Sequence, residues 1–218
     1  MPDVRRSADR FLTEVEGIST RHGFSYGRHY DPDNVGFGAL VAVNDESVAP
    51  GAGYESHGHA GVEIVTWVLE GALAHQDETG QDGVVLPGTA QRLSAGDGVR
   101  HSERNASATE PLRFVQMMLA SRHEGAPAYA SVDVPRLPGR LAATIDVAAP
   151  AVLFVARFEG GETIEVPASP RLFVHVTRGA VMAGTDALAE GDELRDSRAE
   201  PLVLTSTGAA EALVWLLD

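Results

Sequence analysis

Two histidines and a long apolar run lie together in residues 57–71, which read HGHAGVEIVTWVLEG. The run from Glu63 to Leu69 has the length and the Val, Ile and Trp content that are typical of a buried strand. Gly71 then ends this run in a turn. Other apolar runs of strand length, bounded by Gly, Pro or Asp, lie at 84–86, 112–119, 151–158, 171–177 and 212–217. Many short strands with frequent turns predict an all-β fold of sandwiches or barrels.

The composition excludes several classes of function. The 218 residues include no cysteine, so disulfides, thiolate catalysis and Cys–zinc sites are excluded. All 17 basic residues are arginines, and they face 31 acidic residues. The resulting net charge of −14 argues against binding to nucleic-acid phosphates or to anionic membranes. No apolar stretch approaches the length of a membrane span, and we expect a cytoplasmic protein.

An internal repeat indicates two domains. Residues 66–73 (TWVLEGAL) resemble residues 174–181 (VHVTRGAV), and the turn at 94–97 resembles the turn at 189–192. We therefore predict two related β domains, one at 1–125 and one at 130–218, with a linker near 124–137.

Two pairs of side chains that can bind metals share one spacing. His57 and His59 are two residues apart, and so are His101 and Glu103. Alternate side chains of a strand point to the same face, so each pair would project together. If the two strands lie side by side, three imidazoles and one carboxylate converge, a donor set that suits Fe(II) and also Zn, Ni, Cu or Mn. The alternative for an HxH pair alone is two surface histidines.

The order of short motifs resembles the pirin family of the cupin superfamily. Residues 51–63 follow the spacing of the first cupin motif, and residues 98–105 that of the end of the second. The stretches that resemble pirins include FSY at 24–26, YDP at 30–32, GFG at 36–38, ND at 44–45, VAPG at 48–51, EIVT at 63–66, VLEG at 68–71 and HSE at 101–103. Ser56, Gly58 and Val62 depart from the family, which has prolines at the first two positions and commonly an aromatic residue at the third.

The resemblance implies a bicupin, in which two jelly-roll β-barrel domains pack together. It implies one divalent metal per chain in the first domain, held by His57, His59, His101 and Glu103. Fe(II) is the first choice, and Ni, Cu, Mn, Co and Zn are alternatives. Glu63 stands where many cupins have a metal ligand. We interpret it either as a group that orients a ligand or acts as a base, or as a structural carboxylate bonded to backbone, so Glu63 and Glu103 are the candidate catalytic residues.

Bacterial pirins resemble quercetin 2,3-dioxygenases, which implies an oxidoreductase that opens the central ring of a flavonol with O2. The expected ligands are a small aromatic, flavonol-like substrate and O2, and we expect a monomer that binds neither nucleic acid nor membranes directly. Two alternatives remain open. One is a non-catalytic metal-binding regulatory module that binds a protein partner, and the other is a metal-stabilised β protein without catalysis.

The second predicted domain lacks the donor set. When its glycine turns are matched to those of the first domain, the four ligand positions are taken by Glu165, Pro167, Asp196 and Arg198. We therefore predict a degenerate cupin domain there. Of the other histidines, we expect His75 to be bonded to Asp77, His175 to lie in the core, and the rest to be solvated in loops: His22, His29 and His123.

Overall fold

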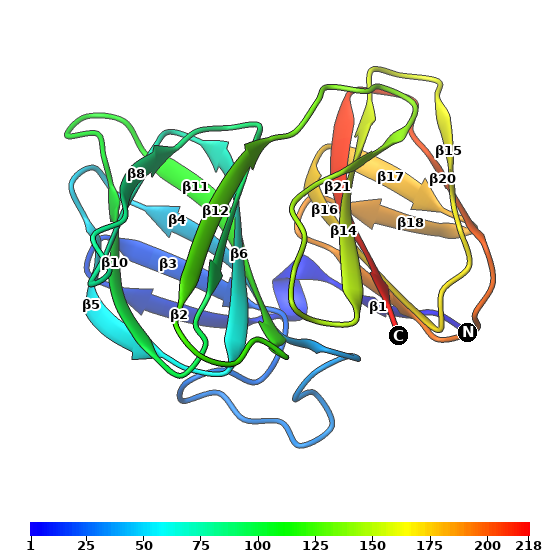
Figure 1. Ribbon diagram of the computed structural model, residues 1–218. Coiled ribbons are helices and arrows are strands. Elements are labelled where there is room, and N and C mark those ends of the chain that lie inside the picture. Colours follow the sequence, from blue (N-terminus) through cyan, green and yellow to red (C-terminus); the bar gives the residue numbers. More distant parts are fainter. The chain divides into compact units, whose positions relative to one another are not determined.

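The computed structural model describes all of residues 1–218, and the chain divides into two compact units. The N-terminal barrel comprises Phe11–Asp133 and Val147–Ala149, and the C-terminal barrel comprises Met1–Arg10, Val134–Asp146 and Pro150–Asp218. Both are built of strands, as predicted, and the one helical element is a 3-10 turn, η1 (Ser7–Asp9) (Figure 1). No helix is long and apolar enough to cross a membrane.

Two antiparallel sheets form the N-terminal barrel. The seven-stranded sheet has the order β12-β9-β6-β11-β4-β3-β2, and the four-stranded sheet has the order β5-β10-β7-β8. The strands are β2 (Phe11–Val15), β3 (Ile18–His22), β4 (Leu40–Val48), β5 (Gly53–His59), β6 (Val62–Glu70), β7 (Leu73–Asp77), β8 (Asp82–Val85), β9 (Thr89–Ser94), β10 (Val99–Asn105), β11 (Leu112–Ala120) and β12 (Ala128–Asp133).

The C-terminal barrel repeats this plan with shorter strands. Its sheets have the orders β1-β19-β16-β21-β14-β13 and β15-β20-β17-β18. The strands are β1 (Asp3–Arg5), β13 (Leu141–Ala143), β14 (Ala151–Phe158), β15 (Thr163–Val166), β16 (Arg171–Arg178), β17 (Ala180–Ala183), β18 (Asp186–Ala189), β19 (Glu193–Asp196), β20 (Leu202–Thr205) and β21 (Ala210–Leu217). Strands β14 to β21 thus correspond, in order, to β4 to β11.

The predicted strand at 63–69 is the centre of the larger N-terminal sheet. It forms β6, which pairs with β9 on one side and with β11 on the other. Every residue from Glu63 to Leu69 is buried, because both faces of this strand are covered. Trp67 is 1% exposed. Burial of such aromatic surface away from water stabilises the folded barrel.

The unit boundaries differ from the predicted ones in three places, one of which is Val147–Ala149 in the N-terminal barrel. The first ten residues belong to the C-terminal barrel, where β1 pairs with β19 and buried Arg10 places Nη2 3.3 Å from Glu193 Oε1. Residues 128–133, inside the predicted linker, form edge strand β12, which pairs with β9. Strands β1 and β12 are short and only partly buried, so their apolar pattern is too weak to be recognised in the sequence.

Candidate metal centre

The two predicted ligand pairs lie on neighbouring strands. Strand β10 pairs with β5, and His101 stands directly opposite His57. Burial alternates along β10, where His101 and Glu103 are each 1% exposed while Arg100 and Arg104 face solvent. The alternation expected from the two-residue spacing is therefore present, and it turns both side chains to the inside of the barrel.

An irregularity in this pairing adds a further residue to the same wall. His101 pairs with His57, but Glu103 pairs with Tyr54, so β5 holds one more residue than β10 across this interval. Such a β-bulge changes the face to which the following side chains point. Tyr54 and His57 therefore line one cavity although they are three residues apart.

The imidazole rings of the three predicted ligands form a compact cluster. The ring centroids of His57 and His101 are 4.5 Å apart, those of His57 and His59 are 4.9 Å apart, and those of His59 and His101 are 5.1 Å apart. One nitrogen from each ring lies within 4.8 Å of the others. Glu103, His101 and His75 form a second group, in which one potential ligand atom from each side chain also lies within 4.8 Å of the others. His101 therefore belongs to both groups.

Buried polar atoms at this cluster lack partners in a way that fits a cation. No hydrogen bond reaches His59 Nε2, either ring nitrogen of His101, or Glu103 Oε1. Burial lowers the pKa of His59 to about 4 and that of His101 to about 3, and neighbouring imidazoles contribute to both shifts. Both rings are therefore uncharged at pH 7, and each can offer a nitrogen lone pair to a metal. Burial raises the pKa of Glu103 to about 7. Since unpartnered buried polar atoms are costly, a divalent metal would satisfy all of them together.

Outer hydrogen bonds orient two of these side chains. Gln116 Nε2 donates to Glu103 Oε2 at 2.7 Å, which leaves Glu103 Oε1 free. His57 Nδ1 lies 2.8 Å from the carbonyl oxygen of Glu55, so Nδ1 is the donor and Nε2 carries the lone pair. Contacts of this kind are typical of side chains that bind metals.

His75 lies on the far side of His101 from the other rings. Its Nε2 is 3.4 Å from Asp77 Oδ2, the contact expected from the sequence, while its Nδ1 has no partner. The His75 ring centroid is 5.3 Å from that of His101. His75 therefore packs behind His101 and limits how that ring can turn.

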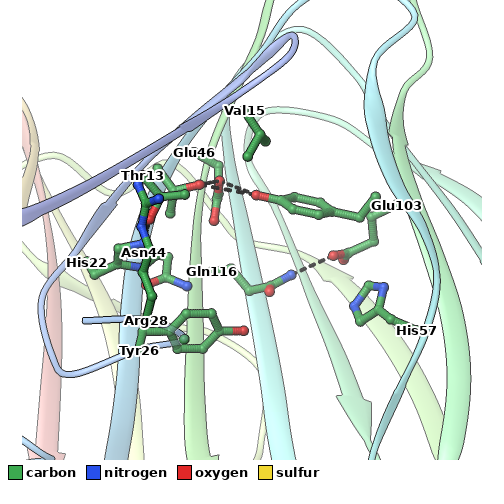
Figure 2. Close-up of a pocket in the computed structure, with 13 residues that line it drawn as sticks. Thr13, Val15, His22, Tyr26, Arg28, Asn44, Glu46, His57, Glu103 and Gln116 are labelled. Carbon is green, nitrogen blue, oxygen red and sulfur yellow. Dashed lines mark hydrogen bonds between the residues drawn. The ribbon is translucent and has the colours of Figure 1, made fainter. Parts of the chain in front are cut away.

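A cavity of about 430 Å³ opens beside the cluster and lies within the N-terminal barrel. One wall comes from β5 and β10 with Tyr54, His57 and Glu103, and the facing wall comes from β3, β4 and β11 (Figure 2). The volume is in the range of small-molecule sites. The facing wall carries polar side chains that the sequence did not single out: Thr20, Asn44, Glu46 and Gln116.

His22 is buried, contrary to the prediction, whereas His29 is partly exposed. His22 is 4% exposed, its Nδ1 lies 2.9 Å from Asn44 Oδ1, and its ring stacks on Tyr26 at the cavity. His29 stacks on Phe11 with a centroid distance of 5.0 Å. The alternation of buried residues on β3 is the sequence signal that could have placed His22 inside. His123 remains at the surface, and His175 is fully buried, as expected.

The pKa of Glu46 gives a prediction about stability. Burial raises this pKa from 4.5 to about 7, although Thr20 and Tyr54 donate hydrogen bonds to the carboxylate and act in the opposite direction. The folded state therefore binds the Glu46 proton more tightly than the unfolded state does. Protonated Glu46 contributes its full stabilisation below pH 4.5, and this contribution is lost as the pH rises through 7. Because glutamine does not ionise, the Glu46→Gln variant does not lose this stability as the pH rises. We expect the free energy of unfolding of the variant to rise relative to wild type by up to about 3 kcal/mol over this range.

The measurement is chemical unfolding of both proteins, freed of metal by a chelator, at several pH values. The two proteins share their other ionisable groups, although Glu46 also raises the pKa of Glu103, so the difference between the two profiles includes that smaller contribution. Parallel stability profiles for wild type and variant would show that Glu46 does not titrate in this way.

Glu63 lies away from the cavity. It is fully buried on β6, where its Oε2 accepts hydrogen bonds from Ser94 Oγ at 2.7 Å and from the backbone N–H of Ala148 at 3.2 Å. Its Oε1 accepts one from Ser121 Oγ at 2.5 Å. These contacts favour the interpretation of Glu63 as a structural carboxylate, because they hold residues 147–149 against the rest of the barrel. Glu63 is an even number of residues from His57 and His59, as expected for side chains on one face of a single strand, but β6 belongs to a different sheet from β5.

This placement predicts a stability effect without an effect on metal binding. Glu63→Ala removes both acceptor oxygens and leaves two serine hydroxyls and the N–H of Ala148 without their partner, at a cost of about 2 kcal/mol. We expect the melting temperature to fall by about 4–8 °C, with unchanged metal content by elemental analysis. A variant that keeps its melting temperature but loses metal would place Glu63 at the metal centre instead.

The C-terminal barrel has apolar side chains at the equivalent place. Strand β20 lies between β15 and β17 as β10 lies between β5 and β7, so β20 is the counterpart of β10. The inward residues of these strands are buried in the hydrophobic core: Ile164, Val166, Leu202 and Leu204. The predicted match between the turns at 96–97 and 191–192 is therefore wrong, because the second turn precedes β19, the counterpart of β9. Asp196 and Arg198 instead pair with each other at 2.7 Å.

Comparison with known proteins follows this geometry. The family model described as Pirin matches residues 4–119. The chain belongs to the pirin family. A relative in Mycobacterium tuberculosis, named "Putative quercetin 2,3-dioxygenase", is 41% identical to this pirin over 98% of the chain and 93% of the relative. The Quercetin 2,3-dioxygenase of Escherichia coli K12 is 39% identical over 56% of the chain and 53% of its own length.

Solved structures agree with the pirin fold. The crystal structure of YhhW from Escherichia coli superposes with a TM-score of 0.95 at 27% identity, covering 100% of this chain and 98% of that one. The bacterial pirin YhhW in complex with nickel(II) superposes with a TM-score of 0.93 at 28% identity, over 100% and 99% of the two chains. The prediction of a pirin-type bicupin is therefore confirmed.

Proposed function

We propose that this pirin is a metal-dependent dioxygenase that opens the central ring of a flavonol with O2 and releases carbon monoxide. The observation that carries the proposal is the set of unpartnered imidazole and carboxylate atoms beside a cavity of about 430 Å³. His57, His59, His101 and Glu103 would hold one divalent metal. The names of the mycobacterial and Escherichia coli relatives support the choice of substrate.

A metal at this place would supply Lewis-acid chemistry that lowers the pKa of a bound hydroxyl and would provide a site for O2. The protein contributes the other requirements. The neutral rings of His59 and His101 present lone pairs at pH 7, and Gln116 holds Glu103 with Oε1 toward the cluster. Glu103 is the proposed acceptor of the flavonol hydroxyl proton, because it lines the cavity and Glu63 does not.

The cavity wall suits a flat aromatic molecule. Tyr26 and Tyr54 contribute aromatic surface, and Val15 adds an apolar side chain to the lining. Such surface binds planar rings and excludes water from the reacting atoms.

The test is aerobic turnover of quercetin, followed by the loss of its visible absorbance and by carbon monoxide release. The protein is first freed of metal and then loaded separately with Fe(II), Ni(II), Cu(II), Mn(II), Co(II) or Zn(II). We expect turnover well above that of each free ion, with Fe(II) as the first choice of metal. Tight metal binding without turnover for any ion would contradict the proposal and favour the regulatory module that binds a protein partner.

A further inference from the structure

One buried carboxylate in the cavity has no role in holding the metal. Glu46, on β4, is 5% exposed and lines the same cavity as His57 and Glu103. No arginine or histidine pairs with it, and its partners are two neutral hydroxyls. Burial of an ionisable group without a cationic partner is expensive, so such a group in a cavity indicates a function.

Both protein hydrogen bonds go to one oxygen of Glu46. Thr20 Oγ1 donates to Oε2 at 2.6 Å, and Tyr54 Oη donates to the same atom at 2.7 Å. Oε1 accepts no hydrogen bond from the protein, and in Figure 2 it points into the cavity. The two hydroxyls thus fix the carboxylate in one orientation and leave one acceptor oxygen for a ligand.

The position of Glu46 separates it from the metal centre. It lies on the wall that faces β5 and β10, as Figure 2 shows with Glu46 across the cavity from Glu103. A ligand that contacts both walls needs one polar group for the metal centre and a second polar group for Glu46. Above pH 7 Glu46 is mainly ionised, and because a carboxylate only accepts hydrogen bonds, the second group of the ligand has to be a donor.

We propose that Glu46 is a specificity-determining residue that accepts a hydrogen bond from a second hydroxyl of the substrate. This inference rests on the proposed function and narrows its substrate class to flavonols with hydroxyl groups in addition to the 3-hydroxyl. Tyr54 and Thr20 are positioning residues that hold the carboxylate for this contact. A flavonol that has only the 3-hydroxyl leaves Glu46 Oε1 without a partner, so Glu46 does not favour its binding.

The test compares two ligands that differ in hydroxyl groups, quercetin and 3-hydroxyflavone, by anaerobic binding titration of the metal-loaded protein at a pH above 7, where Glu46 is ionised. Glu46→Gln keeps the shape and removes the charge, and a charge-assisted hydrogen bond is about twice as strong as a neutral one. We expect its Kd for quercetin to rise about 10-fold and its Kd for 3-hydroxyflavone to change less than 2-fold. Glu46→Ala should show the same selectivity with a larger loss for quercetin, at unchanged metal content. Glu14→Gln, an exposed change on β2, is the matched control and should alter neither Kd.

The outcomes separate this inference from the proposed function. If wild type binds and turns over both flavonols but Glu46→Gln weakens them equally or not at all, the specificity role is wrong and the dioxygenase proposal stands. If metal-loaded wild type binds neither flavonol, both proposals fail. A loss of metal or of folding in both Glu46 variants would show that the carboxylate is structural, which also overturns the inference.

Discussion

His101→Ala should abolish metal binding and turnover together. His101 is the one side chain that belongs to both groups of potential ligand atoms, and it is 1% exposed between His57 and His75. Even loss of an outer partner of a metal ligand typically lowers metal affinity by about 10–100-fold. For removal of this central ring we expect a loss of at least about 100-fold in affinity. Flavonol turnover should fall to the level of the free ion.

The measurements are elemental analysis, metal titration and a thermal shift. A metal that binds only the folded state stabilises it by about 4 kcal/mol at a thousand-fold excess over Kd, so the metal should raise the melting temperature of wild type and not of the variant. His123→Ala is the matched control, because His123 lies in a surface loop with a contact to the Ala126 carbonyl. Full metal content in the His101 variant would show that the four side chains do not share one ion.

Gly53→Ala should weaken metal binding at the same centre by forcing the backbones of β5 and β10 apart. Gly53 pairs with Arg104 where β5 meets β10, and a Cβ there would lie 2.5 Å from Arg104 Cα and closer still to the carbonyl of Glu103. The two strands would have to separate. Overpacking of this kind costs about 1–3 kcal/mol, and these strands carry all four proposed ligands. We therefore expect metal affinity to fall by about 10–100-fold, together with a lower melting temperature.

Gly58→Ala provides the comparison on the same strand. Although Gly58 lies between His57 and His59, a Cβ there would have Arg100 Nη1 as its nearest neighbour at 3.7 Å, an ordinary contact. Metal affinity should therefore change less than about 3-fold in the metal titration. Equal losses in the two alanine variants would show that flexibility of β5, and not close approach of the strands, is what the glycines provide.

Local patterns were sufficient for the fold and for much of the candidate site. The apolar run at 63–69 predicts a buried strand, which is β6, and the two-residue spacing predicts that His101 and Glu103 share a face. Both inferences depend only on strand geometry. The resemblance to pirins implied that His57, His59, His101 and Glu103 bind one metal, and the pairing of β5 with β10 that brings them together is seen only in the structure.

Non-local pairing accounts for what the sequence could not predict. Tyr54 reaches the cavity because of the bulge in β5, so its residue parity relative to His57 is misleading. Glu46 and Gln116 lie on strands that pair from distant parts of the chain. Glu63 has the parity of a ligand but lies in the other sheet, where serine hydroxyls hold it.

The pairing of β1 with β19 has a consequence for synthesis of the protein. Residues 3–5 are synthesised before the N-terminal barrel, whereas their partner strand β19 is synthesised after it. The N-terminal barrel can therefore complete its sheets while the leading strand is still waiting for its partner. Until β19 is made, β1 has no partner strand and can pair with other chains, since unpaired edges promote association. A bulky fusion ahead of Asp3 would delay this last step and should increase aggregation during expression.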